Sequence, residues 1–419
     1  MLFNKTIAHT ASVVTVMTAL WAASGPAGAQ TPAAAGPDRP VSVTASTFAG
    51  YETDVTEGSS ARADGAGASH AGAGLSLDYA AATRKISFYT AGVSEFRYYR
   101  SERGITAPLA SGSAGFGVPL GRRFRFDGSA QSSYLPRFQF SVLPVTTVIP
   151  VDLPQATMDY GISSYDVVSY QGNALLTFRV DDRSSIRLNY GRSQFKYLGR
   201  DYRLDTDSVG AGYSRSLTRY ATLLVGYDEQ NGHYGAHLGS AASTLRRRSI
   251  DAGINYSRPL SQSRRTTIGF TTGSTALDDG NETVYTFTGN AKLNHRLARR
   301  WNLGLAYSRH LGLVGGFDQP IFADSTAVNV EGLLGHRVLF NASAGYSNGT
   351  VGLTSRGRNY DSRQANARVD VPITARRLSV FGNYFYYQYM FDGSVALPAG
   401  LAPHVSRHGV RAGLALKVL

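Results

Sequence analysis

The sequence predicts an all-β protein, a transmembrane antiparallel up-and-down β-barrel of about 18 strands, within a range of roughly 16 to 20. Three observations support this fold class. Residues 41–419 consist of short runs in which apolar residues alternate with small or polar ones. Very short turns that carry arginine alternate along the chain with longer connections rich in Gly, Asp, Asn and Ser. The sequence finishes on one more alternating segment.

The composition excludes several other classes of protein. Only 17% of the 419 residues are charged, while 46 are glycine and 25 are tyrosine, which favours β structure built around turns. The sequence has no cysteine, so a disulfide scaffold, a thiolate metal site and a cysteine nucleophile are all excluded. Mean hydropathy is −0.17. No apolar run beyond residue 24 approaches the roughly 18 residues that a membrane-spanning helix needs.

The first 29 residues are predicted to be a secretory signal peptide. Lys5 supplies the positive start, residues 11–23 form a short apolar stretch, and Ala27-Gly28-Ala29 is a small-x-small cleavage site. A membrane anchor is the alternative, but the apolar stretch is too short for a comfortable span. Residues 30–40 hold three prolines and no apolar pattern, so they are predicted to be a linker. The barrel itself is expected over residues 41–419.

The predicted strands differ from those of a water-soluble sandwich in their second face. In residues 301–308, Trp, Leu, Leu and Tyr alternate with Asn, Gly, Ala and Ser, and residues 250–257 alternate in the same way. A soluble core would place Val and Leu on its inner face, whereas the non-apolar face here is small and polar. A membrane barrel has this arrangement, with lipid on the apolar side and water in the lumen.

The connections are expected to be short at one end of the barrel and long at the other. The short, arginine-bearing turns lie at residues 118–123, 180–183, 216–219, 259–265, 296–300 and 371–377. They recur about every 40 residues, the length of one hairpin, and short turns are periplasmic in outer-membrane barrels. Eighteen strands are then expected to begin near residues 41, 70, 84, 109, 122, 164, 183, 203, 219, 243, 263, 281, 299, 322, 338, 358, 376 and 404.

The final segment resembles the terminal strand of outer-membrane barrels. Gly413, Leu416 and Val418 are spaced as in that signal, although Leu419 stands where the family prefers an aromatic residue. With the signal peptide and hairpins such as residues 299–308, this makes the chain similar to the porin-like outer-membrane β-barrel proteins of Gram-negative bacteria, some of which accompany exopolysaccharide loci. The resemblance implies an outer-membrane location, contact with membrane lipid and lipopolysaccharide, and recognition of the C-terminal strand by the barrel assembly machinery.

Alternation predicts which charged side chains face the lumen. The formal net charge of +13 comes mostly from arginine, whose fixed planar charge suits ion ladders and anionic ligands. Two interpretations remain open for these residues, a structural ion network and a pore that favours anions. Nucleic-acid binding is not expected, because the charge is dispersed around turns. The lumen-facing candidates are Arg123, Arg125, Arg179, Arg187, Arg368, Arg407, Arg411, Asp127, Asp251 and Glu331.

The longest connection, residues 135–163, is too apolar for a freely solvated loop. We expect it to fold into the lumen as a constriction, with an apolar cap or partner surface and a further strand pair as the alternatives. The constriction candidates are Pro136, Phe138, Phe140, Pro144, Pro150 and Pro154.

The resulting functional hypothesis is a porin-like channel for passive passage of small or anionic solutes. The alternative is a non-channel barrel that acts as a structural or partner component, for example in exopolysaccharide export. An enzyme is not expected, because the sequence presents no catalytic, cofactor-binding or metal-ligating set of residues, and a barrel enzyme would need Ser, His and an acid brought together in space.

Overall fold

The protein folds into eighteen β-strands and, within the described residues, contains no α-helix. The computed structural model describes residues 41–53, 67–83, 85–100, 105–135, 166–198, 202–235, 243–259, 265–278, 282–298, 300–313, 317, 319–352, 359–374, 377–395, 397 and 403–418. The predicted signal peptide and linker therefore lie outside the described residues, as do the six constriction candidates. The described part of the chain holds no helix long and apolar enough to cross a membrane.

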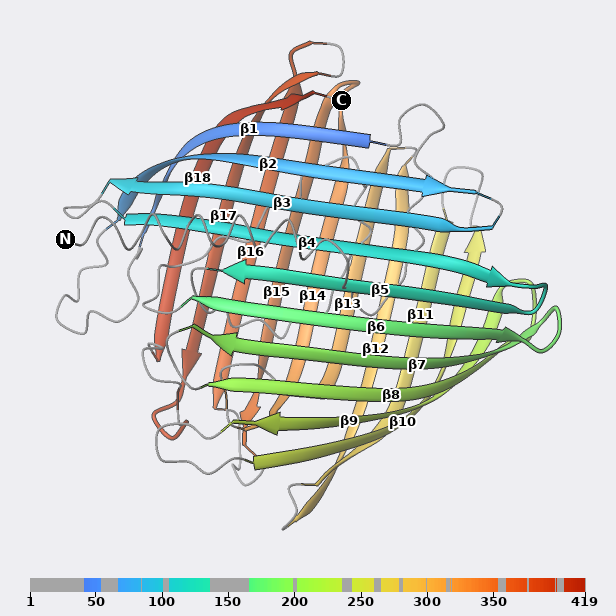
Figure 1. Cartoon of the computed structure of the whole chain (residues 1–419). Helices are drawn as coiled ribbons and strands as arrows, with labels where there is room; N and C mark the ends of the chain where they lie inside the picture. Colours follow the sequence, from blue (N-terminus) through green and yellow to red (C-terminus); the bar gives the residue numbers. More distant parts are fainter. Residues whose placement is uncertain are drawn as a thin grey trace.

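The strands follow one another up and down around the molecule (Figure 1). Their bounds are β1 Val41–Glu52, β2 Ala68–Ala82, β3 Ser87–Arg100, β4 Ile105–Leu120, β5 Phe124–Leu135, β6 Val167–Arg179, β7 Ser184–Tyr197, β8 Arg203–Ser216, β9 Ala221–Tyr234, β10 Ser243–Pro259, β11 Arg265–Asp278, β12 Thr283–Ala298, β13 Trp301–Gly312, β14 Ile321–Leu334, β15 Val338–Val351, β16 Tyr360–Pro372, β17 Leu378–Phe391 and β18 His404–Lys417.

The sheet closes on itself. Each strand pairs antiparallel with its neighbours in sequence, and β1 also pairs with β18, with Thr44 opposite Lys417 and Glu52 opposite Gly409. The predicted fold class and the count of eighteen are confirmed. The expected strand starts are also close to those found, the largest difference being at β4, which begins at Ile105 instead of near residue 109.

Connections at one end of the barrel, the short-turn end, are three or four residues long where they are described throughout, such as 121–123, 180–183 and 335–337. Gly121 and Gly335 have φ of 87° and 66°, the left-handed region that a side chain disfavours, so glycine allows these chain reversals. The turn at 335–337 was not among those predicted. The opposite end, which we call the long-connection end, carries the longer segments.

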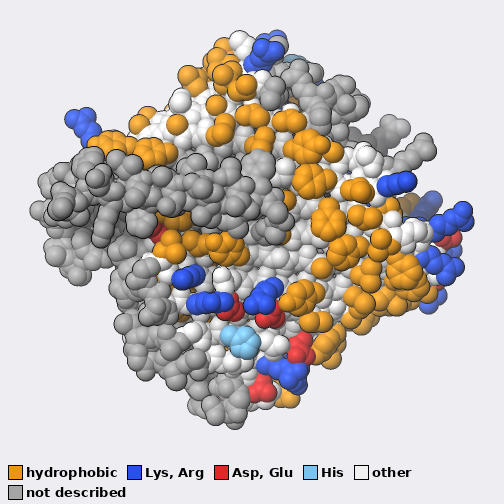
Figure 2. Space-filling view, in the orientation of Figure 1, with side chains coloured by type: hydrophobic (Ala, Val, Ile, Leu, Met, Phe, Trp, Pro, Cys, Tyr) orange, Lys and Arg blue, Asp and Glu red, His pale blue; other side chains and the backbone are white. Residues whose placement is uncertain are grey.

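The outer face of the barrel is apolar. In β18, Val410 and Leu414 are 53% and 48% exposed, whereas the alternate residues Arg407 and Arg411 are 2% and 6% exposed. Hydrophobic side chains cover much of the visible outer surface (Figure 2). Phe287 and Ile250 follow the same pattern at 78% and 62% exposed. A closed sheet with this alternation presents one apolar face outward and leaves its other face to line the interior.

The inner face is not small and polar throughout, which corrects the sequence-based expectation. Toward the long-connection end its side chains form a large apolar cluster, built from strand ends and from two residues of the connections, Tyr202 and Phe317. Alternation predicts which way a side chain points, but not what covers it. The buried members are Val167, Tyr197, Tyr202, Leu204, Tyr234, Leu245, Leu277, Leu311, Phe317, Ile321, Ala323, Val351, Tyr360, Tyr387, Tyr389, Phe391 and Val405.

Candidate functional site

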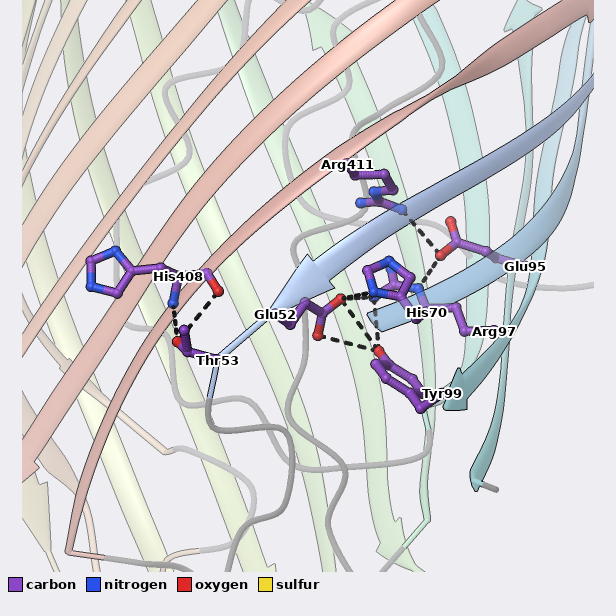
Figure 3. Close-up of polar contacts among 8 residues, drawn as sticks. All are labelled: Glu52, Thr53, His70, Glu95, Arg97, Tyr99, His408 and Arg411. Atoms are coloured by element: carbon purple, nitrogen blue, oxygen red, sulfur yellow. Dashed lines mark hydrogen bonds and ion pairs between the residues drawn. The ribbon is translucent and has the colours of Figure 1, made fainter. Parts of the chain in front are cut away.

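The inner wall where the first and last strands meet holds a buried group of charged residues (Figure 3). We call it the seam cluster; its members are Glu52, His70, Glu95, Arg97, Tyr99 and Arg411. All six are less than a tenth exposed. They come from β1, β2, β3 and β18, so the cluster ties together the strands that close the barrel.

Two carboxylates organise the seam cluster. The Oε1 atom of Glu52 lies 3.4 Å from Nη1 of Arg97 and 3.5 Å from Nδ1 of His70. The hydroxyl of Tyr99 donates to Oε2 of Glu52 at 3.3 Å. Glu95 is paired with Arg97 on its own strand and lies 3.3 Å from Nη1 of Arg411. Buried charges of both signs therefore compensate one another on this wall.

Glycines make room for these long side chains. Gly50 of β1 stands between Arg411 of β18 and His70 of β2 in the register of the sheet. A Cβ atom at Gly50 would lie 2.7 Å from Cε1 of His70. Gly74 of β2 is opposite Glu95 in the same way. The guanidinium of Arg411 can thus reach β3 across two intervening strands.

Two further ion pairs join residues two apart on one strand, where side chains share a face. Arg368 donates to Asp370 through Nε at 2.7 Å and Nη2 at 2.6 Å, and its guanidinium lies 4.4 Å from the centre of the Phe381 ring. Arg125 donates to Asp127 through Nε at 2.9 Å. These contacts run along the wall and do not cross the lumen.

The other predicted lumen residues are placed differently. Arg179 and Arg187 lie on the inner face near the short-turn end, both exposed, and neither has a side-chain ion pair within the described ranges. Arg123 lies in the β4–β5 turn and is exposed. Three candidates remain: the acids Asp251 and Glu331, and Arg407.

Asp251 is half-buried on β10 beside Gly226, and Oε1 of Glu331 accepts a hydrogen bond from Nδ2 of Asn302 at 2.9 Å. Arg407, at 2% exposed, is among the most buried side chains of the inner face. The ten candidates therefore do not form one site, since they are distributed around the wall from β4 to β18.

Uncharged polar side chains cover much of the wall between these charges. Hydroxyls on neighbouring strands bond to one another, as Ser133 does with Ser169 at 2.7 Å and Ser193 with Thr206 at 2.6 Å. Such groups act as donors and acceptors without fixed charge. This part of the interior offers hydrogen bonds to water and to polar solutes.

Sequence reasoning missed most of the seam cluster. Glu95, Arg97 and Tyr99 occupy alternate positions of β3, while Phe96 and Tyr98 between them are 47% and 48% exposed. That alternation is readable in the sequence and would have placed all three residues on the inner face. Their meeting with Glu52 and Arg411 depends on closure of the barrel.

The described residues contain no group of three or more His, Cys, Asp and Glu side chains arranged to hold a metal ion. The site that the fold defines is instead the interior wall of a large closed barrel whose outer face is apolar.

Comparison with known proteins finds likeness in solved structures alone. No family model matches the chain, and no curated protein does. Among similar structures, Pseudomonas aeruginosa OpdQ has a TM-score of 0.45 at 11% identity, covering 91% of this chain and 100% of that one. P. aeruginosa OccK5 (OpdH) has a TM-score of 0.44 at 12% identity, covering 90% and 98%. Acinetobacter baumannii OccAB2 has a TM-score of 0.44 at 10% identity, with the same coverage.

Proposed function

We propose that this protein is an outer-membrane channel for the passive passage of small polar or anionic solutes. The observation that carries the proposal is a closed barrel of eighteen strands with an apolar outer face and an interior that, outside the apolar cluster at the long-connection end, is lined largely by hydroxyl, amide and charged groups. Barrels of roughly 16 to 18 strands are wide enough to leave an aqueous path.

The outer face supports placement in a membrane. Toward the long-connection end the outer face changes from apolar to charged side chains. Tyrosines lie at the boundary between these two parts of the surface. The hydroxyl of Tyr227 donates to Glu229 at 2.8 Å, and Nη2 of Arg246 lies 2.6 Å from the same carboxylate. Tyr307 donates to Asp324 at 2.8 Å. Tyrosines with an apolar body and a polar tip favour the membrane–water interface.

The remaining parts of the proposal rest on the sequence. Residues 1–29 act as a cleaved signal peptide, and the terminal strand is recognised by the barrel assembly machinery. The charged belt beyond the tyrosines contacts lipopolysaccharide. We also propose that residues 135–163 constrict the lumen, so deletion of their central part is expected to raise the conductance of an intact barrel.

A second candidate function is passage of a polysaccharide, as in exopolysaccharide export. It is favoured by the uncharged Ser, Thr and Asn side chains of the inner wall, which match the hydroxyls of a sugar. Current block by neutral oligosaccharides would favour this candidate over a channel for small anions.

The channel function is tested with the purified full-length chain in planar bilayers and in liposome-swelling assays. We expect discrete current steps and uptake of small solutes, both lost when the same protein is unfolded by heat before reconstitution. A folded barrel that gives neither current nor swelling contradicts the proposal.

A further inference from the structure

An aromatic row crosses the lumen near the long-connection end. Tyr202, which leads into β8, donates its hydroxyl to the carbonyl oxygen of Phe317 at 3.2 Å. Phe317 belongs to the β13–β14 connection, and its ring centre is 5.3 Å from that of Phe391 at the end of β17. In a closed ring of eighteen strands, β8 and β17 are nine places apart and so stand on opposite walls. Phe317 therefore bridges the two sides of the barrel.

Each end of the row is anchored in its own wall. The Tyr202 ring lies 5.3 Å from Tyr197 of β7. The Phe391 ring lies 5.4 Å from Tyr389 and 6.2 Å from Tyr360. Tyr202, Phe317 and Tyr389 are each only 1% exposed. Side chains that line a water-filled channel would be much more exposed. The row is packed as a protein core is packed.

The end of β13 and the first residue of the connection that carries Phe317 lie against β10 and β9. Nη1 of Arg247 on β10 donates to the carbonyl oxygen of Leu311, the next-to-last residue of β13, at 2.8 Å. A Cβ atom at Gly232 of β9 would overlap the side chain of Leu313, which shows how closely this segment lies against β9. Phe317 thus contacts Tyr202 and Phe391 from a connection whose first residue, Leu313, lies against β9.

We propose that Phe317 is the selectivity-determining residue at this mouth, the central member of an apolar barrier that slows the passage of hydrated ions while it is in place. The inference rests on the proposed channel function. A narrow apolar constriction loses its water, and an ion that enters must shed hydration without gaining polar contacts. Solutes that pass must displace the Phe317 ring, which an organic molecule with an apolar face does more easily than an inorganic ion.

The first experiment tests the packing without relying on transport. Because the natural sequence has no cysteine, Phe317→Cys carries a single thiol. Its reaction with a charged methanethiosulfonate reagent is compared with that of Asp181→Cys, in an exposed short turn. We expect Phe317→Cys to react at least about a hundredfold more slowly, since labelling must await local opening. Equal rates overturn the barrier.

The second experiment measures the barrier as conductance in KCl. Phe317→Ser is expected to raise single-channel conductance about tenfold over the unaltered chain, because the constriction becomes wettable. Phe391→Ser, from the opposite wall, should also raise the conductance. It keeps the barrier testable if Phe317→Ser fails to fold. Tyr346→Ser is the matched control, since Tyr346 lies on the outer face and is 39% exposed.

The outcomes separate the two proposals. Equal conductance of the unaltered chain and both row variants overturns the barrier and leaves the channel function standing. If no folded variant conducts and none supports liposome swelling, the channel function itself is wrong and the role of Phe317 falls with it.

Discussion

Gly409 of β18 leaves the space that the ring of Phe385 on the neighbouring strand occupies. The two residues are paired in the register of β17 and β18, and a Cβ atom at Gly409 would overlap the ring. Phe385 is itself only 4% exposed, so the ring has little freedom to move aside. A residue without a side chain on one strand thus permits an aromatic residue on the next.

Gly409→Ala is therefore expected to destabilise the barrel by about 1–3 kcal/mol, the usual cost of overpacking. Gly382→Ala on β17 is the matched control, because an added Cβ there meets no atom within 4 Å. Urea unfolding in detergent measures both variants. Equal stability of the two would show that the Phe385 ring shifts freely.

Leu305→Arg should destabilise the folded barrel by about 2–4 kcal/mol, because Leu305 lies midway along β13 on the lipid-facing side. Asn290→Arg is the control on the adjacent strand, where the side chain is exposed on the inner face and bonded to Thr271. The fraction of heat-modifiable barrel on gels and unfolding in lipid vesicles report the difference. A larger loss at Asn290 would reverse the assignment of the two faces.

Glu95→Gln should destabilise the protein by about 3–5 kcal/mol, because it leaves two buried arginines with one fewer negative charge. Adding Arg411→Gln should restore part of that loss, since Nη1 of Arg411 lies 3.3 Å from Oε1 of Glu95. A double-mutant cycle in urea measures the coupling. Additive effects of the two changes would argue against a direct ion pair.

Replacing Arg179 and Arg187 with glutamine should move the reversal potential in a KCl gradient away from anion preference. Both lie on the inner face without an acidic partner among the described residues, and fixed charge in a lumen concentrates ions of opposite sign. The shift should fade at high salt, as the Debye length falls from about 10 Å at 0.1 M to about 3 Å at 1 M.

Arg215→Gln is the matched control for charge, because Arg215 is exposed on the outer face of β8 at the same end. The Phe317→Ser background supplies enough current for the measurement. An equal shift from Arg215→Gln would attribute the selectivity to general surface charge.

The β6–β7 turn should make stability depend on acid pH. Backbone N–H groups of Arg183 and Ser184 donate to Oδ1 of Asp181 at 2.6 and 2.7 Å, and the Arg183 bond chiefly lowers the pKa of this carboxyl. A lowered folded-state pKa contributes stability that is complete above the unfolded value of about 3.9 and is lost as pH falls through the folded value.

Asp181→Asn keeps an acceptor oxygen but does not titrate. The stability difference between the natural chain and this variant should therefore shrink as pH is lowered from about 5 to about 2. Urea unfolding across this pH range measures it. A difference that stays constant would remove Asp181 from the acid response.

The sequence by itself determined the architecture. Period-two alternation fixes which side chain of each strand faces lipid, and turn residues such as Gly121 mark where the chain reverses, so eighteen strands and their approximate starts were predictable. These signals are local, because they depend on neighbours one to four residues away. Arg411 and Asp127 could be assigned to the non-apolar face of their strands for the same reason.

Only the tertiary structure decided which residues meet inside. Glu95 and Arg411 are 316 residues apart in sequence, and closure of β1 on β18 brings them together. Tyr202, Phe317 and Phe391 form a row only because two connections and the end of β17, from different parts of the barrel, meet at one end. Alternation carries no information about such distant partners, since it records the face of a side chain and not the wall or connection it will touch.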